Sequence, residues 1–453
     1  MNEGDYNIEM SSIMGDRYPS LCLSLLWKAR VFYEKERLQE GVALCKSRMA
    51  MAYFSLWQRH KLKADRFIIE ARRLVNKELK REDFLDADAQ QAFDAQRKLI
   101  NSDTKPTETS IVPTNLPNLL DVLEDIAFDE EYFHLDKGVM RSLFPTHYQE
   151  DMFETIQMSD GKVRLYPCTL SPFRYYRGQS DKLEGKQCKP SLFRGLTAAE
   201  MFHERLCLKE LELLLQDYPL TKVFDGVMCY RTPEGYKQMF LNVDTTALGQ
   251  HYGIKTSVLD LTADKWVAAF FAATEYKNGE YHPYKKEGEG VVYIYRYVPA
   301  LDEASERLNA VGLQPFMRPG CQAGLVYKMM PGEDFNKIAQ RRVFKHDPAV
   351  SELIYNYCHR SKNLFPDEIL EVKVNAIRKS HCYSQKALTN TINDYYHGST
   401  QEEISSYLTD LGITIQEAPV LAFTEEELKL FAERWNQEKE HFFDSIFVRT
   451  MFA

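Results

Sequence analysis

The sequence lacks the features of a secreted or membrane-embedded protein. Its longest apolar run, Trp266 to Ala273, is far shorter than the ~20 residues that a bilayer-spanning helix needs. The opening residues, MNEGDYNIEM, contain neither a basic start nor an apolar stretch, so we expect no secretory signal. We therefore expect a cytoplasmic protein with no membrane partner.

Paired cysteines are also missing. The chain has nine cysteines, an odd number, and no two of them form a CxxC pair. Reduced thiols in a cytosolic protein explain this pattern best, whereas a disulfide framework or a structural zinc site would need paired cysteines. We expect no bound metal.

Common catalytic signatures are absent as well. The chain contains no GxxxxGK[ST], GxSxG or HExxH motif, which argues against a P-loop nucleotide hydrolase, a serine hydrolase of that type and a zinc protease. The net charge of −9 gives no broad electrostatic attraction to nucleic acid or to an anionic membrane. We do not expect nucleic acid as a partner.

The composition is that of a folded globular protein. Apolar residues make up 44% of the chain, charged residues 27% and aromatic residues 12%. The length of 453 residues suffices for about three domains of ~150 residues each.

Residues 1–100 are expected to form a helical region. Between Leu21 and Leu99 there is no proline and one glycine, Gly41, and apolar residues recur at helical spacing. We expect these helices to pack on the next domain, on a copy of themselves or on a protein partner.

The rest of the chain divides by composition. Residues 101–117 are rich in Pro, Ser, Thr and Asn and are predicted to be a linker, followed by a helical lead-in at 118–163. Residues 164–374 alternate strand-like runs (172–178, 290–298 and 323–329) with helical runs (198–216 and 262–276), which predicts a mixed α/β domain. Residues 375–453 are predicted to be helical, with a capping box that begins at Thr424. The predicted fold class is α+β.

Three motifs of the central domain carry a resemblance. They are FRYYRGQ at 173–179, LGQHYGIKTSVLDLT at 248–262 and PGCQAGLV at 319–326. In this order and spacing they resemble the FRG domain family, with its [FY]RG-Q strand, its QHYG-x-x-T-x-x-LDWT segment and its later Q-x-G-x-[FV] strand. Leu261 departs from the family, because it replaces the tryptophan often found there and removes an indole N–H.

Arg177 is the first candidate binding residue. A guanidinium at a strand end offers a planar fork of donors to phosphate, and Gly178 would let a ligand approach the backbone. The alternative is an arginine that pairs with a carboxylate and locks the strand end.

His251 admits two interpretations, whereas Asp260 and Thr262 are expected to have supporting roles. His251 is either a proton carrier or donor to a sugar hydroxyl, or a buried ring that orients its loop toward Asp260. Asp260 lies in an apolar run and must pair with Arg, His or helix N–H groups, which favours a supporting role. Thr262 is expected to cap the helix that follows it.

Gln322 is expected on or just before a late strand. Its side chain should share a face with Gly324, whose small size would leave room for a ligand. The alternative is a glutamine that hydrogen-bonds a sheet edge.

The layout is also similar to that of ADP-ribosyltransferases. The similarity implies NAD as substrate, with Arg177 on the diphosphate and Thr256-Ser257 at the nicotinamide ribose. Gln322 takes the place of a late-strand glutamate but lacks the negative charge that stabilises an oxocarbenium-like transition state; Glu352 lies downstream as another source of charge. The implied nucleotide-binding residues are Tyr176, Arg177, Gly178, Gln179, Thr256 and Ser257, and the implied catalytic residues are His251 and Gln322.

Three hypotheses stay open. The first is an NAD-using transferase or glycohydrolase, in a toxin or defence role. The second is a module that senses a nucleotide or another phosphorylated ligand without turnover. The third is an effector that acts on nucleic acid.

Overall fold

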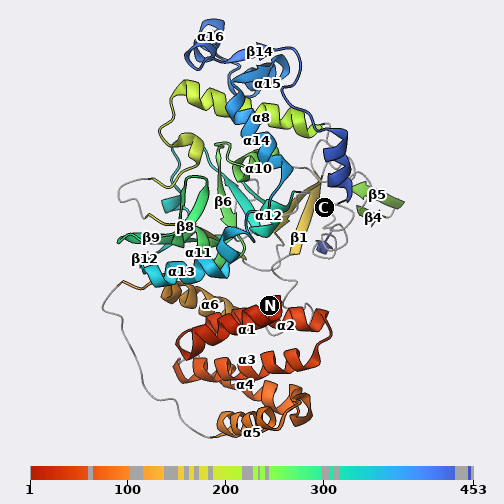
Figure 1. Ribbon diagram of the computed structural model, residues 1–453, viewed down its shortest axis with the longest axis vertical. Helices are drawn as coiled ribbons and strands as arrows, with labels where there is room; N and C mark the ends of the chain where they lie inside the picture. Colours follow the sequence, from red (N-terminus) through yellow and green to blue (C-terminus); the bar gives the residue numbers. More distant parts are fainter. Residues whose placement is uncertain are drawn as a thin grey trace. The chain divides into compact units, whose positions relative to one another are not determined.

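The chain forms two compact units, described in turn (Figure 1). The computed structural model describes residues 2–59, 65–102, 116–136, 152–157, 163–167, 173–181, 187–216, 228–232, 235–239, 244–297, 307–310, 316–433 and 447–449. The first unit comprises residues 1–147 with 284–289 and 343–353, and the second comprises the remainder.

The first unit is helical. Its helices are α1 (Glu3–Met14), α2 (Pro19–Lys35), α3 (Gln39–Arg59), α4 (Asp65–Arg73), α5 (Ala87–Asn101) and α6 (Leu119–Asp136). Glu124 of α6 accepts hydrogen bonds from the backbone N–H groups of Ser20 and Leu21, both at 2.9 Å, so a carboxylate satisfies the free donors at the start of α2. The prediction of a helical N-terminal region is confirmed.

The predicted linker and lead-in are only partly described. Residues 103–115 of the linker lie outside the described residues. Within the lead-in, α6 is followed by a strand, β1 (Met152–Gln157), which pairs with β2 (Val163–Pro167) and, in parallel, with β15 (Phe447–Arg449). The segment expected to be helical therefore also supplies a strand, which pairs both with the next strand, β2, and with β15 far away in the sequence.

The second unit is built on a six-stranded sheet of order β10-β11-β6-β3-β9-β12. The strands are β3 (Phe173–Gln179), β6 (Val258–Thr262), β9 (Glu289–Tyr297), β10 (Leu308–Ala310), β11 (Gly324–Lys328) and β12 (Gln340–Lys345). The three predicted strands are confirmed as β3, β9 and β11. With helices before and after the sheet, the α+β fold class is confirmed.

Helix α11 (Lys265–Ala273) packs directly on β3. It begins two residues after Ala263, the start that a cap at Thr262 implies, because Asp264 is its cap and accepts from the N–H of Trp266 at 2.7 Å. The prediction that Thr262 is the cap is wrong: its hydroxyl donates to the carbonyl of Gln322 at 2.7 Å. The helix also ends at Ala273, since the hairpin β7 (Thr274–Lys277) and β8 (Glu280–Pro283) follows.

Opposite faces of the sheet are covered by different layers. The face opposite α11 carries a core of Tyr175, Leu259, Leu261, Tyr293, Leu325 and Phe335. Because strand side chains alternate between faces, Tyr176, Gly178 and Asp260 belong to the α11 face.

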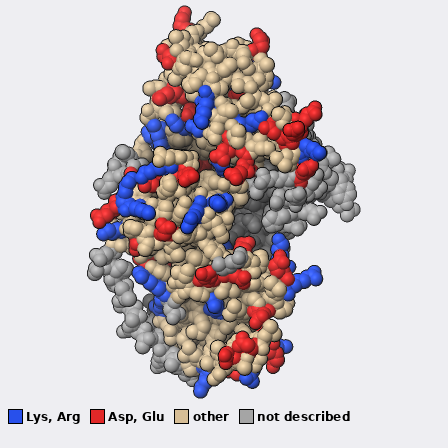
Figure 2. Space-filling model, in the orientation of Figure 1, with Lys and Arg blue, Asp and Glu red and all other residues tan. Residues whose placement is uncertain are grey.

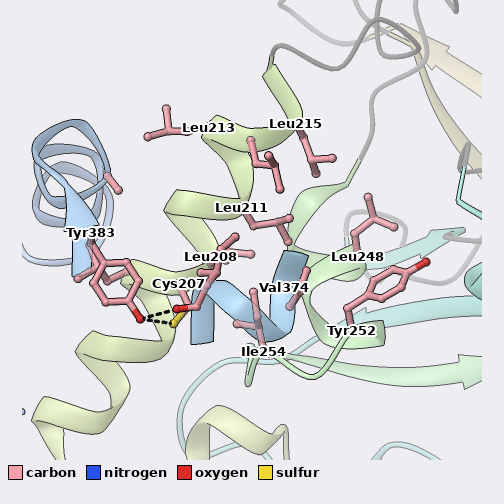
Figure 3. Close-up of a cluster of buried hydrophobic side chains, with 14 of the residues drawn as sticks. Cys207, Leu208, Leu211, Leu213, Leu215, Leu248, Tyr252, Ile254, Val374 and Tyr383 are labelled. Carbon is pink, nitrogen blue, oxygen red and sulfur yellow. Dashed lines mark hydrogen bonds between the residues drawn. The ribbon is translucent and has the colours of Figure 1, made fainter. Parts of the chain in front are cut away.

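A second core is formed by helices around α8 (Ala198–Gln216), which the sequence predicted with these bounds. Figure 3 shows leucines of α8 meeting Leu248 of α10 (Thr245–His251) and Val374 of α14 (Ile369–Ser380). The boundary expected at residue 374 thus falls inside a helix.

The region after α14 is mainly helical, as predicted. It contains α15 (Gln385–Tyr395), α16 (Gln401–Asp410) and the short strands β13 (Cys382–Ser384) and β14 (Thr414–Gln416). The capping box is confirmed, because Thr424 and Glu427 exchange backbone-to-side-chain hydrogen bonds of 2.8 and 3.2 Å ahead of a helix at 425–433. The remaining elements are the hairpin β4 (Met228–Thr232) and β5 (Gly235–Met239), α12 (Met317–Cys321) and α13 (Pro348–Tyr357).

None of the helices in the described part of the chain combines the length and apolar character needed to cross a bilayer. On the face drawn in Figure 2, Lys and Arg side chains are interspersed with Asp and Glu side chains.

Candidate functional site

Asp260 lies at the centre of the candidate site. It occupies the middle of β6, where it is paired with Val326 of β11, and its side chain is 37% exposed. Both neighbours along the strand, Leu259 and Leu261, point into the apolar core on the other face. The carboxylate therefore projects from a strand in which the residues on either side of it are apolar.

Gln250 holds one oxygen of this carboxylate. Its Nε2 donates to Asp260 Oδ2 at 3.0 Å. Its own Oε1 accepts from the hydroxyl of Thr256 at 2.8 Å and from that of Ser191 at 3.3 Å. The amide of Gln250 is thus oriented by two hydroxyl donors, which fixes Asp260 in turn.

His251 and Gln322 are in direct contact. His251 Nδ1 lies 3.0 Å from Gln322 Oε1, and Gln322 Nε2 donates to the carbonyl of Leu364 at 3.0 Å. Because the Gln322 amide donates through its nitrogen, its oxygen is the acceptor, and the proton of a neutral His251 ring lies on Nδ1. The pKa of His251 is lowered by burial, although Asp260 and the bond to Gln322 oppose that effect.

The other ring nitrogen faces the other carboxylate oxygen. His251 Nε2 and Asp260 Oδ1 are 3.9 Å apart, too far for a hydrogen bond. Both atoms are buried, and neither has a hydrogen-bond partner among the described residues. The site therefore contains two acceptors with no donor between them.

Gly324 makes space for the imidazole. A Cβ at this position would lie 3.0 Å from Cε1 of His251 and 3.1 Å from its Nε2. Gln322 lies just before a late strand, as predicted, between α12 and β11, but the room expected for a ligand beside Gly324 is filled by the His251 ring. Gln322 itself is buried, and both the oxygen and the nitrogen of its amide are hydrogen-bonded within the protein.

Arg177 contacts the backbone of the same strand. Its Nη1 donates to the backbone carbonyl of Asp260 at 2.9 Å, and its Nε is buried with no hydrogen-bond partner among the described residues. Arg194 lies near Arg177. Desolvation of the Arg194 guanidinium and the positive charge of Arg177 lower the pKa of Arg194. Cys188 and Asp260 oppose this shift. Arg177 thus contacts a backbone oxygen of Asp260 and not its carboxylate.

The neighbours of Arg177 have other roles than those predicted. A Cβ on Gly178 would lie 1.7 Å from the carbonyl oxygen of Ala268, so this glycine admits helix α11 and not a ligand. Tyr176 is 1% exposed on the same covered face. Gln179 donates to the carbonyl of Asp181 at 2.8 Å, at an exposed position.

The remaining predicted residues are placed as follows. Thr256 is buried and bonded to Gln250, and Ser257 accepts from the N–H of Met329 through its carbonyl. Glu352 belongs to the first unit. The structure thus brings His251 and Gln322 together and connects Arg177 to them through Asp260; a single ligand that contacts all three stays a prediction.

Residues 174–280 match the family model of the FRG domain. The chain contains an FRG domain. The matched segment of this FRG domain includes Arg177, Gln250, His251 and Asp260, whereas Gln322 lies beyond it. Neither a curated protein nor a solved structure matches the chain.

Sequence reasoning missed Arg194 and the importance of Gln250. Arg194 lies outside β3 and belongs to none of the three motifs, so only its proximity to Arg177 identifies it. Gln250 stands in the recognised QHYG segment, and that was a usable signal. Within the described ranges, no group of three or more His, Cys, Asp or Glu side chains could hold a metal ion.

Proposed function

We propose that the FRG domain binds NAD or a related nucleotide, with its diphosphate on the guanidinium groups of Arg177 and Arg194. One observation carries this proposal: Arg177 uses one N–H on a backbone carbonyl while its buried Nε has no partner in the described chain. A buried donor without an acceptor is costly, and a phosphate oxygen would satisfy it. The nearby positive charge of Arg194 adds to the attraction for an anion.

The similarity to ADP-ribosyltransferases supports NAD within this ligand class. There, an arginine in a comparable strand-end motif binds the diphosphate side of NAD. We therefore propose an ADP-ribosyltransferase-like or NAD-cleaving reaction that releases nicotinamide.

Substitution of Arg177 tests the binding proposal. Arg177→Lys keeps the charge but loses the planar fork, so NAD affinity should fall by about 1.5–3 kcal/mol, roughly 10- to 150-fold. Arg177→Ala should be at least as damaging. Isothermal titration of the full chain with NAD, ADP-ribose and nicotinamide measures this, with Arg296→Lys on the exposed side of β9 as the matched control. Unchanged NAD affinity in Arg177→Ala would contradict the proposal.

The same variant separates binding from a purely structural role. Since the Arg177 partner is a carbonyl and not a buried carboxylate, Arg177→Ala should cost about 1–3 kcal/mol of unfolding free energy. A loss of ~3–5 kcal/mol, typical of a broken buried ion pair, together with an undiminished NAD-induced shift in melting temperature, would favour the structural role.

Binding without turnover is the second candidate. It is favoured because the side chains of Thr256 and Gln322, two residues proposed to act on NAD, are already hydrogen-bonded within the protein. Assay of nicotinamide release from NAD distinguishes the two, because a sensing module would bind NAD and leave it intact.

A further inference from the structure

Among the described residues, none supplies a hydrogen-bond donor to the gap between His251 and Asp260. The lone pair of His251 Nε2 faces Asp260 Oδ1 at 3.9 Å, and neither atom has a hydrogen-bond partner among the described residues. In the neutral ring the proton is fixed on Nδ1 by the Gln322–Leu364 chain. A hydroxyl group placed here would donate to one acceptor or be shared by both.

The surrounding residues keep this arrangement fixed. Gln250 donates a hydrogen bond to Asp260 Oδ2 and accepts hydrogen bonds from two hydroxyls. The imidazole of His251 packs against Gly324, where no side chain blocks it. The His251 side chain is 3% exposed, whereas that of Asp260 is 37% exposed. The Asp260 side chain is therefore partly accessible to a ligand, while its Oδ1 atom is buried beside the imidazole.

We propose that Asp260 is a catalytic residue of the FRG domain, with His251 as its proton-accepting partner. This inference rests on the proposed NAD-cleaving function. Asp260 would supply the negative charge that Gln322 lacks, and its carboxylate would stabilise the cation that develops on the ribose.

The chemistry balances without a further reagent. The bond between the ribose C1′ and the nicotinamide nitrogen breaks, and its electron pair neutralises the pyridinium ring. The resulting ribosyl cation is stabilised by the Asp260 carboxylate. A water molecule or an acceptor hydroxyl then forms the new bond to C1′, and its proton passes to His251 Nε2 or Asp260.

Asp260→Asn is the decisive variant. The amide keeps the shape and an oxygen for Gln250 but loses the charge. Nicotinamide release should fall by about 100-fold or more, while NAD affinity changes by less than about threefold. Asp367→Asn, at an exposed position after Leu364, is the matched control and should leave both quantities unchanged.

A rescue experiment separates chemistry from structural support. Asp260→Ala leaves space for a small carboxylate, so added formate should restore part of the nicotinamide release. A supporting role for Asp260 predicts a lower melting temperature with no response to formate.

The outcomes are distinguishable from those of the binding proposal. If wild type binds NAD but Asp260→Asn releases nicotinamide at the wild-type rate, the inference is overturned and the binding proposal stands. NAD binding by wild type with no release overturns the inference and the proposed nicotinamide-releasing reaction, and leaves the binding proposal standing. Failure of wild type to bind NAD overturns the proposed function itself.

Discussion

Gly178 leaves no space for a side chain. A Cβ there would lie 1.7 Å from the carbonyl oxygen of Ala268 and 2.7 Å from the backbone nitrogen of Ala272. The obstacle is helix backbone, which cannot rotate away as a side chain can. This glycine is therefore needed for the contact between β3 and α11, next to the proposed ligand site.

Gly178→Ala should destabilise the protein by about 3 kcal/mol or more, because the helix or the strand must shift. Urea unfolding measures this. Gly398→Ala is the matched control, since a Cβ at that exposed position meets no atom within 4 Å and should change stability little. Equal unfolding midpoints for the two variants would contradict the packing described for β3 and α11.

At the scale of elements, α8 and β13 are joined by a small polar cluster inside an apolar core. His203 Nε2 lies 2.6 Å from the hydroxyl of Tyr383, and Cys207 Sγ lies 3.2 Å from the same hydroxyl; Figure 3 draws the latter contact. Burial lowers the pKa of His203 to about 4, with help from the nearby positive charges of His381, Arg378 and Lys255. Burial raises the pKa of the Cys207 thiol to about 12.

This cluster predicts an acid-sensitive contact. The folded pKa of His203 lies below its ordinary value of 6.5, so between those pH values the unfolded chain binds more protons. The contribution of His203 to the free energy of unfolding is fully present above pH ~6.5 and is lost as the pH falls toward about 4. Because solvent screens this half-buried ring, the loss between pH 7 and pH 5 should be about 1 kcal/mol.

Urea unfolding at pH 7 and pH 5 checks this prediction. His203→Gln should reduce the difference between the two pH values, because an amide does not titrate. The exposed His282, changed to Gln, is the control and should keep the wild-type difference. An unaltered pH dependence in His203→Gln would show that this histidine is accessible to protons in the folded state.

At the scale of the whole molecule, the two units are not consecutive in sequence. The first unit includes residues 284–289 and 343–353, which come from within the segment predicted as one central domain. Lys345 donates its N–H to the carbonyl of Pro117 at 2.8 Å, and the ring of His346 stacks on that of Tyr284.

Limited proteolysis should cut first within residues 101–117. This Pro-rich, polar segment is predicted to make few contacts, and such segments are preferred cleavage sites. Brief digestion with proteinase K followed by mass spectrometry of the fragments locates the first cut. A first cut elsewhere, with 101–117 intact, would contradict the linker prediction.

Features that depend on neighbouring residues could be predicted from the sequence. Helical spacing predicted α8 with its bounds, β-branched and aromatic runs predicted β3, β9 and β11, and Thr424 with Glu427 predicted a capping box. The FRG resemblance likewise rested on contiguous motifs. These signals are local, so they can be read along the chain without knowledge of how it folds.

The contacts of the site residues depend on how distant segments fold together. His251 and Gln322 are 71 positions apart, and Arg177 and the Asp260 carbonyl are 83 apart, so no local pattern relates them. The sequence suggested that Gly178 and Gly324 leave room for a ligand, but helix α11 and the His251 ring occupy those spaces. A missing side chain leaves space for whatever the fold brings closest, and that depends on packing between distant segments.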